Sequence, residues 1–307
     1  ANGYQALFNL TTGNNNTASG GKALFNNTEG NGNTASGYQA LFKNSTGLQN
    51  TASGSGALKL NTTGKQNTAS GFQALYENTT ANSNTASGYQ ALYNNTTGNY
   101  NTATGYRALF SNTLGGITGG EEGERNTANG YEALYSNTTG FYNTASGYQA
   151  LKSNISGSYN TASGYDALSV NTTGTDNTAS GSRALEKNSV GSFNTASGSL
   201  SLNNNEGNSN TASGVNVLYN NTEGNGNTAI GVNALFENKT GSFNTAIGRG
   251  ADVTTGALTN ATAIGYNAKV DTSDKVRIGN TSVNRIEGNV AFSASSDARL
   301  KENITVV

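Results

Sequence analysis

Residues 84–100 read NTASGYQALYNNTTGNY, and this 17-residue unit recurs along almost the whole chain of 307 residues. The tripeptide Asn-Thr-Ala begins at residues 16, 33, 50, 67, 84 and 101, and again at 126, 143, 160, 177, 194, 210, 227 and 244. The interval of 17 therefore changes twice, by eight added residues and by one lost residue. A degenerate copy begins at Asn260. Such a short fixed period is typical of a solenoid, in which each repeat packs mainly on its neighbours.

We number each unit from its first Asn, so the unit above runs from position 1 (Asn84) to position 17 (Tyr100). Position 15 is usually Gly after Asn-Thr-Thr, a turn composition in which Asn mimics the backbone and Gly accepts positive φ. Position 5 is Gly in every complete copy, which predicts a second corner. The segments between these corners have about five residues, a usual strand length. We expect an all-β solenoid with two short strands per coil, although a single helical turn at Tyr-Gln-Ala-Leu remains an alternative.

Strand alternation places positions 2 and 4 on one face. Position 4 is mostly Ser but becomes Ile230, Ile247 and Ile264 near the end, so we expect this face to be the interior. Positions 3 and 5 stay small, which indicates close approach of two backbones. Leu at position 9, as in Leu92, is the only large aliphatic residue that recurs in nearly every unit, and it should fill the core. Because Ala91 beside it is equally constrained, we expect the opposite face of that strand to contact a partner.

The composition excludes several classes of protein. The chain has 41 Gly and no Pro, Cys, Met, Trp or His, with 11% charged residues, 33% hydrophobic residues and a net charge of -1. A nucleic acid or anionic membrane partner would require clustered Lys and Arg. No apolar run approaches the roughly 20 residues that cross a bilayer. Without His and Cys the commonest catalytic and metal-binding groups are missing, so we expect neither an enzyme of substrate chemistry nor a metal or other cofactor.

Aromatic residues recur at position 6, as in Tyr89, and at position 10, as in Tyr93. Stacked coils would arrange them in ladders along the solenoid. These ladders either stabilise the packing of coil on coil or offer a platform for sugar rings, and we favour the packing interpretation.

The eight-residue insertion lies within residues 114–125, where extra residues of a solenoid are expected to form a loop on one face. Its carboxylates Glu121, Glu122 and Glu124 are candidate cation ligands, but solvated side chains are the better interpretation. The many Asn-x-Thr sequons, such as Asn61-Thr62-Thr63, follow from repetition of the turn.

The last units, Asn244-Thr245-Ala246-Ile247-Gly248 and Ala261-Thr262-Ala263-Ile264-Gly265, resemble the head repeats of trimeric autotransporter adhesins. This resemblance implies a left-handed parallel β-roll assembled as a homotrimer. One Leu per 17 residues is also a thin core against a backbone entropy cost of about 1 to 2 kcal/mol per residue, so oligomerisation is expected on physical grounds.

Residues 295–304, SSDARLKENI, resemble the opening of the C-terminal intramolecular chaperone of phage tail spikes and endosialidases. In that family the chaperone assembles three chains and then often cuts itself off. The resemblance implies that Ser296 is the nucleophile, Lys301 its activating base, and the bond after Ser296 the scissile one. A neutral Lys can take the hydroxyl proton of a Ser where no His exists.

We therefore divide the chain into a solenoid shaft (1–270), a β neck or cap (271–296) and the start of a chaperone (297–307). The expected function is the shaft of a homotrimeric extracellular attachment fibre, on a phage or phage-like injection particle or on a bacterial surface. Its expected partners are its own copies, with cell-surface glycans or receptors as further candidates, and no nucleic acid or membrane. The alternative is a monomeric solenoid that binds ice or carbohydrate. An enzyme with a fibre tail would need a catalytic domain upstream.

Overall fold

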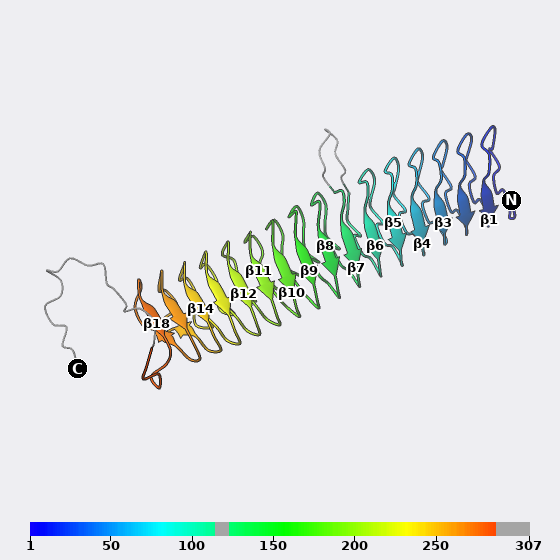
Figure 1. Cartoon of the computed structure of the whole chain (residues 1–307). Coiled ribbons are helices and arrows are strands. Elements are labelled where there is room, and N and C mark those ends of the chain that lie inside the picture. The colour runs from blue at the N-terminus through cyan, green and yellow to red at the C-terminus, as the bar shows by residue number, and fades with distance from the viewer. Residues whose placement is uncertain (114–122, 287–307) are drawn as a thin grey trace.

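A computed structural model describes residues 1–113 and 123–286. The coils stack along one axis into a long rod, with one row of strands along its side (Figure 1). Within these residues, sixteen strands form a single parallel sheet in which each strand pairs with that of the next coil, and β15 and β17 form a second sheet of two strands. The predicted all-β parallel solenoid of 17-residue coils is thereby confirmed.

The strands of the first sheet share one short motif, Thr-Ala followed by Ser, Thr, Asn or Ile, except for the last one. They are β1 (Thr17–Ser19), β2 (Thr34–Ser36), β3 (Thr51–Ser53), β4 (Thr68–Ser70), β5 (Thr85–Ser87), β6 (Thr102–Thr104), β7 (Thr127–Asn129), β8 (Thr144–Ser146), β9 (Thr161–Ser163), β10 (Thr178–Ser180), β11 (Thr195–Ser197), β12 (Thr211–Ser213), β13 (Thr228–Ile230), β14 (Thr245–Ile247), β16 (Thr262–Ile264) and β18 (Val276–Ile278). The second sheet pairs β15 (Asp252–Val253) with β17 (Lys269–Val270).

The prediction of two strands per coil is wrong for the repeating coils, which have one strand of three residues each. The segment at positions 6–11 forms consecutive turns instead, and it is not a helical turn either. Its positions 7 and 9 have positive φ, for example 53° at Gln90 and 51° at Leu92. The turns still bond from coil to coil, since the Leu92 N–H donates to the carbonyl of Ala108 at 3.0 Å. Backbone groups are therefore paired without a second strand.

The predicted interior face of the strand is also wrong. Ala at position 3 points inward and is fully buried, as at Ala86, whereas Thr85 and Ser87 on either side are exposed. The strand therefore contributes only the methyl group of its Ala to the interior. The isoleucines of position 4 consequently point outward, and Ile247 is 42% exposed.

Leu92 is fully buried, as predicted, and so is Ala91 beside it. In a strand, adjacent side chains would point to opposite faces. The alternation of negative and positive φ turns both of these side chains into the interior of the same coil. The inference that Ala91 faces a partner is therefore wrong.

Two buried columns of asparagines complete the core. Asn61, at position 12, donates from its side chain to the side-chain oxygen of Asn44 one coil away at 2.7 Å and to the carbonyl of Gly64 at 3.1 Å. Asn50, at position 1, donates to the same Gly64 carbonyl at 2.8 Å. Its backbone N–H donates to the side-chain oxygen of Asn33 at 2.9 Å. Burial without partners would be costly, and these ladders remove that cost.

Glycine is favoured at positions 5 and 15 for different physical reasons. Gly37, at position 5, has a φ of 133°, and a Cβ there would lie 2.6 Å from the carbonyl oxygen of Gly54 in the next coil. Gly47, at position 15, does not have positive φ, contrary to expectation, but a Cβ there would lie 2.6 Å from the carbonyl oxygen of Gly64. The predicted close approach of backbones at position 5 is correct, and it also explains position 15.

Both changes of period fall between positions 12 and 15. Asn112 donates to the carbonyl of Gly123 at 2.9 Å, as the equivalent pair does in a regular coil, so the extra residues lie between them. Asn205 makes the same bond to Gly207 at 2.8 Å, with one residue fewer between them. The strands on either side remain in register, as Thr102 pairs with Thr127. Residues 114–122, which include the eight extra residues, lie outside the described part of the chain.

The last coils restore ordinary strand geometry at positions 9 and 10. Val253 and Val270 fill the core from position 10, and position 9 holds Asp252 and Lys269, whose side chains form an ion pair at 3.1 Å. β18 pairs in parallel with β16, so it extends the main sheet into the segment that the sequence separates as a neck.

Candidate functional site

The strict register converts each outward position into a column of side chains along the rod. At position 6, six rings form one stacked ladder with centroid separations of 5.1 to 5.3 Å. Its members are Phe72, Tyr89, Tyr106, Tyr131, Tyr148 and Tyr165. The predicted aromatic ladders are confirmed.

Position 10 carries three shorter ladders, with separations of 5.1 to 5.6 Å. They consist of Phe8, Phe25 and Phe42, then Tyr76, Tyr93, Phe110 and Tyr135, and then Tyr219 and Phe236. Cations lie at two ladder ends: the Lys59 ammonium donates a hydrogen bond to the Tyr76 hydroxyl at 2.9 Å, and the Arg183 guanidinium lies 5.8 Å from the ring centre of Tyr165.

These stacked rings expose their edges rather than their faces. A sugar ring stacks on an aromatic face, and within a ladder the faces between neighbouring rings are already covered. Stacked pairs are worth about 0.5 to 1.5 kcal/mol beyond their buried area. The geometry therefore favours the packing interpretation for positions 6 and 10.

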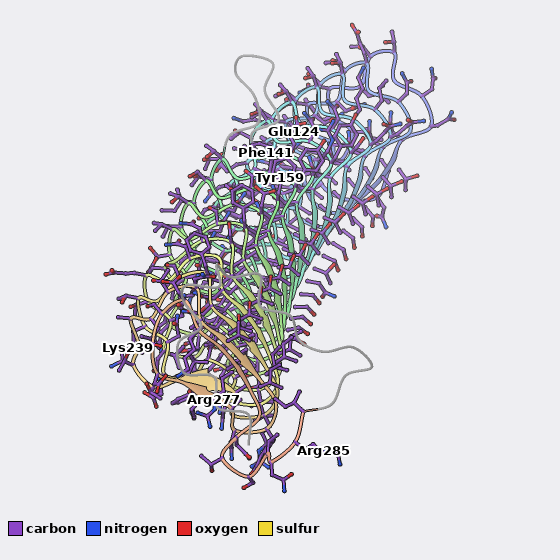
Figure 2. All side chains as sticks on the ribbon, turned by 60° about the vertical axis from the view of Figure 1, so that its left-hand side comes forward. Glu124, Phe141, Tyr159, Lys239, Arg277 and Arg285 are labelled. Carbon is purple, nitrogen blue, oxygen red and sulfur yellow. The ribbon has the colours of Figure 1, made fainter. Side chains whose placement is uncertain are left out.

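A further column of rings, at position 17, was not singled out from the sequence. Tyr142 and Tyr159 stack at 5.3 Å, and Phe141 packs edge-on against Tyr159 on the same flank of the rod (Figure 2). The Arg125 guanidinium lies between Tyr100 and Tyr142, 5.5 and 5.2 Å from their ring centres. The signal was present as recurrent Tyr and Phe at one position, but most coils hold a polar residue there.

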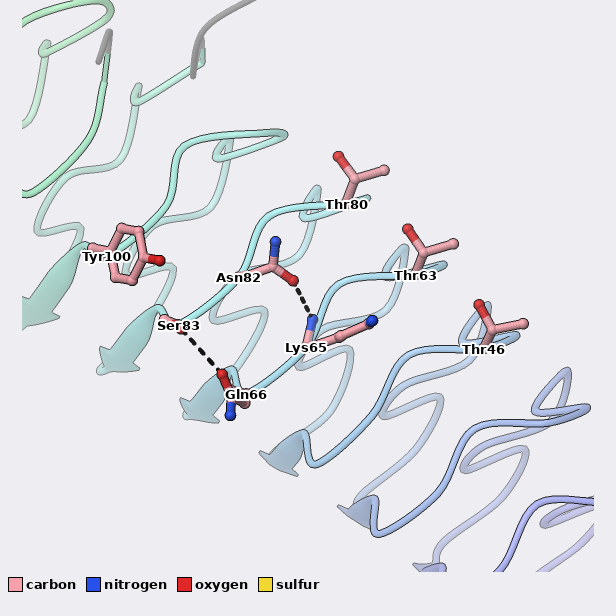
Figure 3. A pocket seen from close by; sticks show the side chains of 8 residues that line it. All are labelled: Thr46, Thr63, Lys65, Gln66, Thr80, Asn82, Ser83 and Tyr100. Atoms are coloured by element: carbon pink, nitrogen blue, oxygen red, sulfur yellow. Dashed lines mark hydrogen bonds between the residues drawn. The ribbon is translucent and has the colours of Figure 1, made fainter. Parts of the chain in front are cut away.

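Beside this column a shallow groove of about 610 Å³ runs along coils of the N-terminal half. A row of threonines at position 14 forms one side, Tyr100 stands at one end, and polar side chains of positions 16 and 17 lie between them (Figure 3). It is lined by Thr46, Thr63, Thr80, Lys65, Asn82, Gln66, Ser83 and Tyr100.

Hydrogen bonds between coils hold the floor of this groove. The backbone N–H of Lys65 donates to the side-chain oxygen of Asn82 at 2.8 Å, and the N–H of Asn82 donates to that of Asn99 at 2.7 Å. The Ser83 hydroxyl donates to the side-chain oxygen of Gln66 at 3.5 Å. The floor is thus fixed by the backbone, whereas the threonine hydroxyls and the Lys65 side chain are exposed.

A smaller cavity of about 270 Å³ near the C-terminal end contains Asp252 in its lining. Burial raises the pKa of this carboxyl, and the nearby Lys269 ammonium and two backbone N–H groups oppose that rise. The carboxylate accepts a hydrogen bond from the Val253 N–H at 2.9 Å. Because the Asp252 carboxylate is already paired with the Lys269 ammonium, we assign these two residues a structural role and do not treat the cavity as a ligand site.

Most of the predicted catalytic and cation-binding residues lie outside the part of the chain that the structure describes. Ser296 and Lys301 lie beyond the described residues, as do Glu121 and Glu122. Glu124 is described, and its carboxylate accepts a hydrogen bond from Asn99 at 2.7 Å. Within residues 1–113 and 123–286, no three His, Cys, Asp or Glu side chains are grouped as a metal site would require. The same residues include no helix of the length and apolarity that a membrane span needs.

Comparison of the chain with protein-family models gives no match, and comparison with curated proteins gives none either.

Proposed function

We propose that this chain is the shaft of a homotrimeric extracellular attachment fibre, carried by a phage, a phage-like injection particle or a bacterial surface. The rod-like stack of coils supports this proposal, because it sets a fixed separation between whatever lies at its two ends (Figure 1). The proposed number of three subunits rests on the resemblance to trimeric adhesin heads and tail-spike chaperones.

One column of exposed isoleucines carries the proposal. Ile230, Ile247, Ile264 and Ile278 pair in register on β13, β14, β16 and β18 and are 45%, 42%, 36% and 48% exposed. A contiguous exposed stripe of aliphatic side chains is typical of an interaction site. Copies arranged in parallel around an axis along the rod would bring this column from each chain together at the same height, which buries like against like.

The mass of the protein in solution tests this proposal. Native mass spectrometry or sedimentation equilibrium should give three times the chain mass of 31.4 kDa. A monomeric mass with unchanged β-sheet circular dichroism would favour the alternative, a solitary binding solenoid.

That alternative has one observation in its favour. On β1 to β12, Thr of position 2 and a polar residue at position 4 form two exposed columns in register, as on β5, where Thr85 and Ser87 point outward. Regular hydroxyl columns on a parallel sheet are suited to ordering water in an ice-like array. Thermal hysteresis measured for a monomeric protein would support ice binding. A trimeric protein without thermal hysteresis would exclude ice binding.

Maturation by self-cleavage belongs to the same proposal and rests on the resemblance alone. In a precursor that carries the whole chaperone, Ser296→Ala or Lys301→Ala should leave the chaperone attached, because the first removes the nucleophile and the second its activating base. Assembly should survive both changes. Release of a fragment beginning at Asp297 from either variant would contradict the assignment of the dyad.

A further inference from the structure

We infer that the groove between the position-14 threonines and Tyr100 binds a short oligosaccharide, with the ring of Tyr100 as its stacking platform. This inference goes beyond the proposed shaft function and does not depend on the subunit number. The groove lies before β7, whereas the exposed isoleucines begin at β13.

Tyr100 is the one aromatic residue among those that line the groove, and one of its ring faces has no neighbouring ring. At position 17, rings of consecutive coils cover one another, as Tyr142 and Tyr159 do at 5.3 Å. On the side of the following coil, Arg125 covers Tyr100. On the side of the preceding coil, position 17 is Ser83, which is too small to cover an aromatic face. Tyr100 is 56% exposed and lines one end of the groove (Figure 3).

The lining suits a polyhydroxylated ligand. Thr46, Thr63 and Thr80 present hydroxyl groups in a row, and each hydroxyl both donates and accepts hydrogen bonds. The side chains of Gln66 and Asn82 add amide groups, whose oxygens already accept a hydrogen bond from Ser83 and from Lys65 and keep a second lone pair for a ligand. A single aromatic ring among polar groups provides too little apolar surface for a lipid, and the single cation Lys65 provides too little charge for a nucleic acid.

The length of the groove selects an oligosaccharide over a single sugar. Its lining comes from four consecutive coils, from that of Thr46 to that of Tyr100. At the strand spacing of about 4.8 Å these coils span about 14 Å. The hydroxyl row repeats at the same interval, so successive sugar units would meet equivalent groups. The ammonium of Lys65 would favour units that carry a carboxylate.

The test measures binding of four trisaccharide probes to the purified chain by saturation-transfer NMR and isothermal calorimetry. The probes are maltotriose, cellotriose, tri-N-acetylchitotriose and trigalacturonic acid. Ser83→Tyr is the decisive variant, because a ring at this position should stack on the open face of Tyr100 as Tyr142 stacks on Tyr159. It blocks the site while adding a stabilising contact. Ser209→Tyr places the same residue at position 17 of a remote coil and is the matched control.

We expect at least one probe to bind the native chain, with Ser83→Tyr abolishing binding and Ser209→Tyr leaving it unchanged. Tyr100→Ala should weaken binding by about tenfold, the factor that corresponds to about 1.4 kcal/mol. Two results would overturn the inference. The first is that none of the four probes binds at probe concentrations up to the millimolar range, and the second is that Ser83→Tyr binds a probe as well as the native chain does. Neither result would alter the measured mass, so this test and that of the shaft proposal fail separately.

Discussion

The side-chain amide of Asn112 donates a hydrogen bond to the side-chain oxygen of Asn95 at 2.7 Å, one coil away and inside the rod. Asn95 in turn donates to Asn78 at 3.2 Å and to the carbonyl of Gly98 at 2.9 Å. Each asparagine of this column thus links three coils. The stability of the shaft should depend on these amides as much as on its leucines.

Replacement of one ladder amide should be costly. Asn95→Ala leaves Asn112, the side-chain oxygen of Asn78 and the carbonyl of Gly98 each with one buried hydrogen bond fewer. Since an unsatisfied buried group costs about 1 to 3 kcal/mol, we expect a loss of about 2 to 4 kcal/mol in unfolding free energy. The neighbouring Asn94→Ala, at a half-buried position, is the control and should be nearly neutral. Equal melting curves for the two variants would show that the ladder contributes no stability.

The same asparagine ladder should prevent N-glycosylation at position 12. The sequon asparagines of position 12, such as Asn61, are fully buried and use the side-chain nitrogen that a glycan would occupy. Folded protein exposed to a glycosylating host should therefore carry no glycan at Asn61, as peptide mapping would show. A glycan found there in soluble, folded chains would contradict the buried ladder.

Leu92 should contribute strongly to stability. Its side chain is fully buried, and Leu92→Ala should cost about 2 to 5 kcal/mol, measured by denaturant unfolding. Leu48→Ala, at a half-buried position, should cost clearly less. If the two variants unfold alike, position 9 does not form the core.

Glycine at position 5 should be irreplaceable. Gly37→Ala combines a φ of 133° with a Cβ 2.6 Å from the carbonyl oxygen of Gly54, so the two coils must separate locally. We expect a loss of more than about 2 kcal/mol. Gly21→Ala, whose Cβ would meet only the ring of Tyr38 at 3.4 Å, should be tolerated. Calorimetric melting temperatures of the two variants provide the comparison.

The exposed isoleucines should control assembly. Ile247→Ser together with Ile264→Ser should lower the mass from trimer to monomer while the circular dichroism of the solenoid persists, because neither side chain belongs to the core. Ile155→Ser, on an outer turn where Ile155 is 47% exposed, is the control. An unchanged oligomer in the double variant would place the interface elsewhere.

Stability should fall in acid partly through Glu132. Burial raises the pKa of its carboxyl, but hydrogen bonds from Lys152, at 2.9 Å, and Gln149 outweigh burial and leave the pKa below its usual value. A lowered pKa in the folded state stabilises the protein above the unfolded pKa of about 4.3, and this contribution is lost as the pH falls through the folded value. Glu132→Gln should therefore lower the melting temperature at pH 6 and lose this effect near pH 2. Glu29→Gln, on an exposed turn, is the control, and a constant difference across pH would contradict the ion pair.

The period, the solenoid class, the buried leucines and the aromatic ladders could be predicted from the sequence because each depends only on repetition. Identical residues at a fixed interval must stack when coils stack, so Tyr89 and Tyr106 meet whatever path the chain takes within a coil. Turn residues and short intervening segments likewise restrict the fold to a solenoid.

The path within the coil was decided by the tertiary structure. Leu92 adopts a φ of 51°, which ordinarily costs about 1 to 2 kcal/mol, because burial of its side chain and the bond from its N–H to Ala108 outweigh that cost. This local inversion places Ala91 and Leu92 on the same side, which does not follow from strand alternation. The structure also decided which face of the strand lies inside, with Ser87 outward, and that Asn95 is buried. The groove depends on the same path, because side chains at position 17 stack from coil to coil. Only this stacking places the small Ser83 next to Tyr100 and leaves one face of that ring without a neighbouring ring.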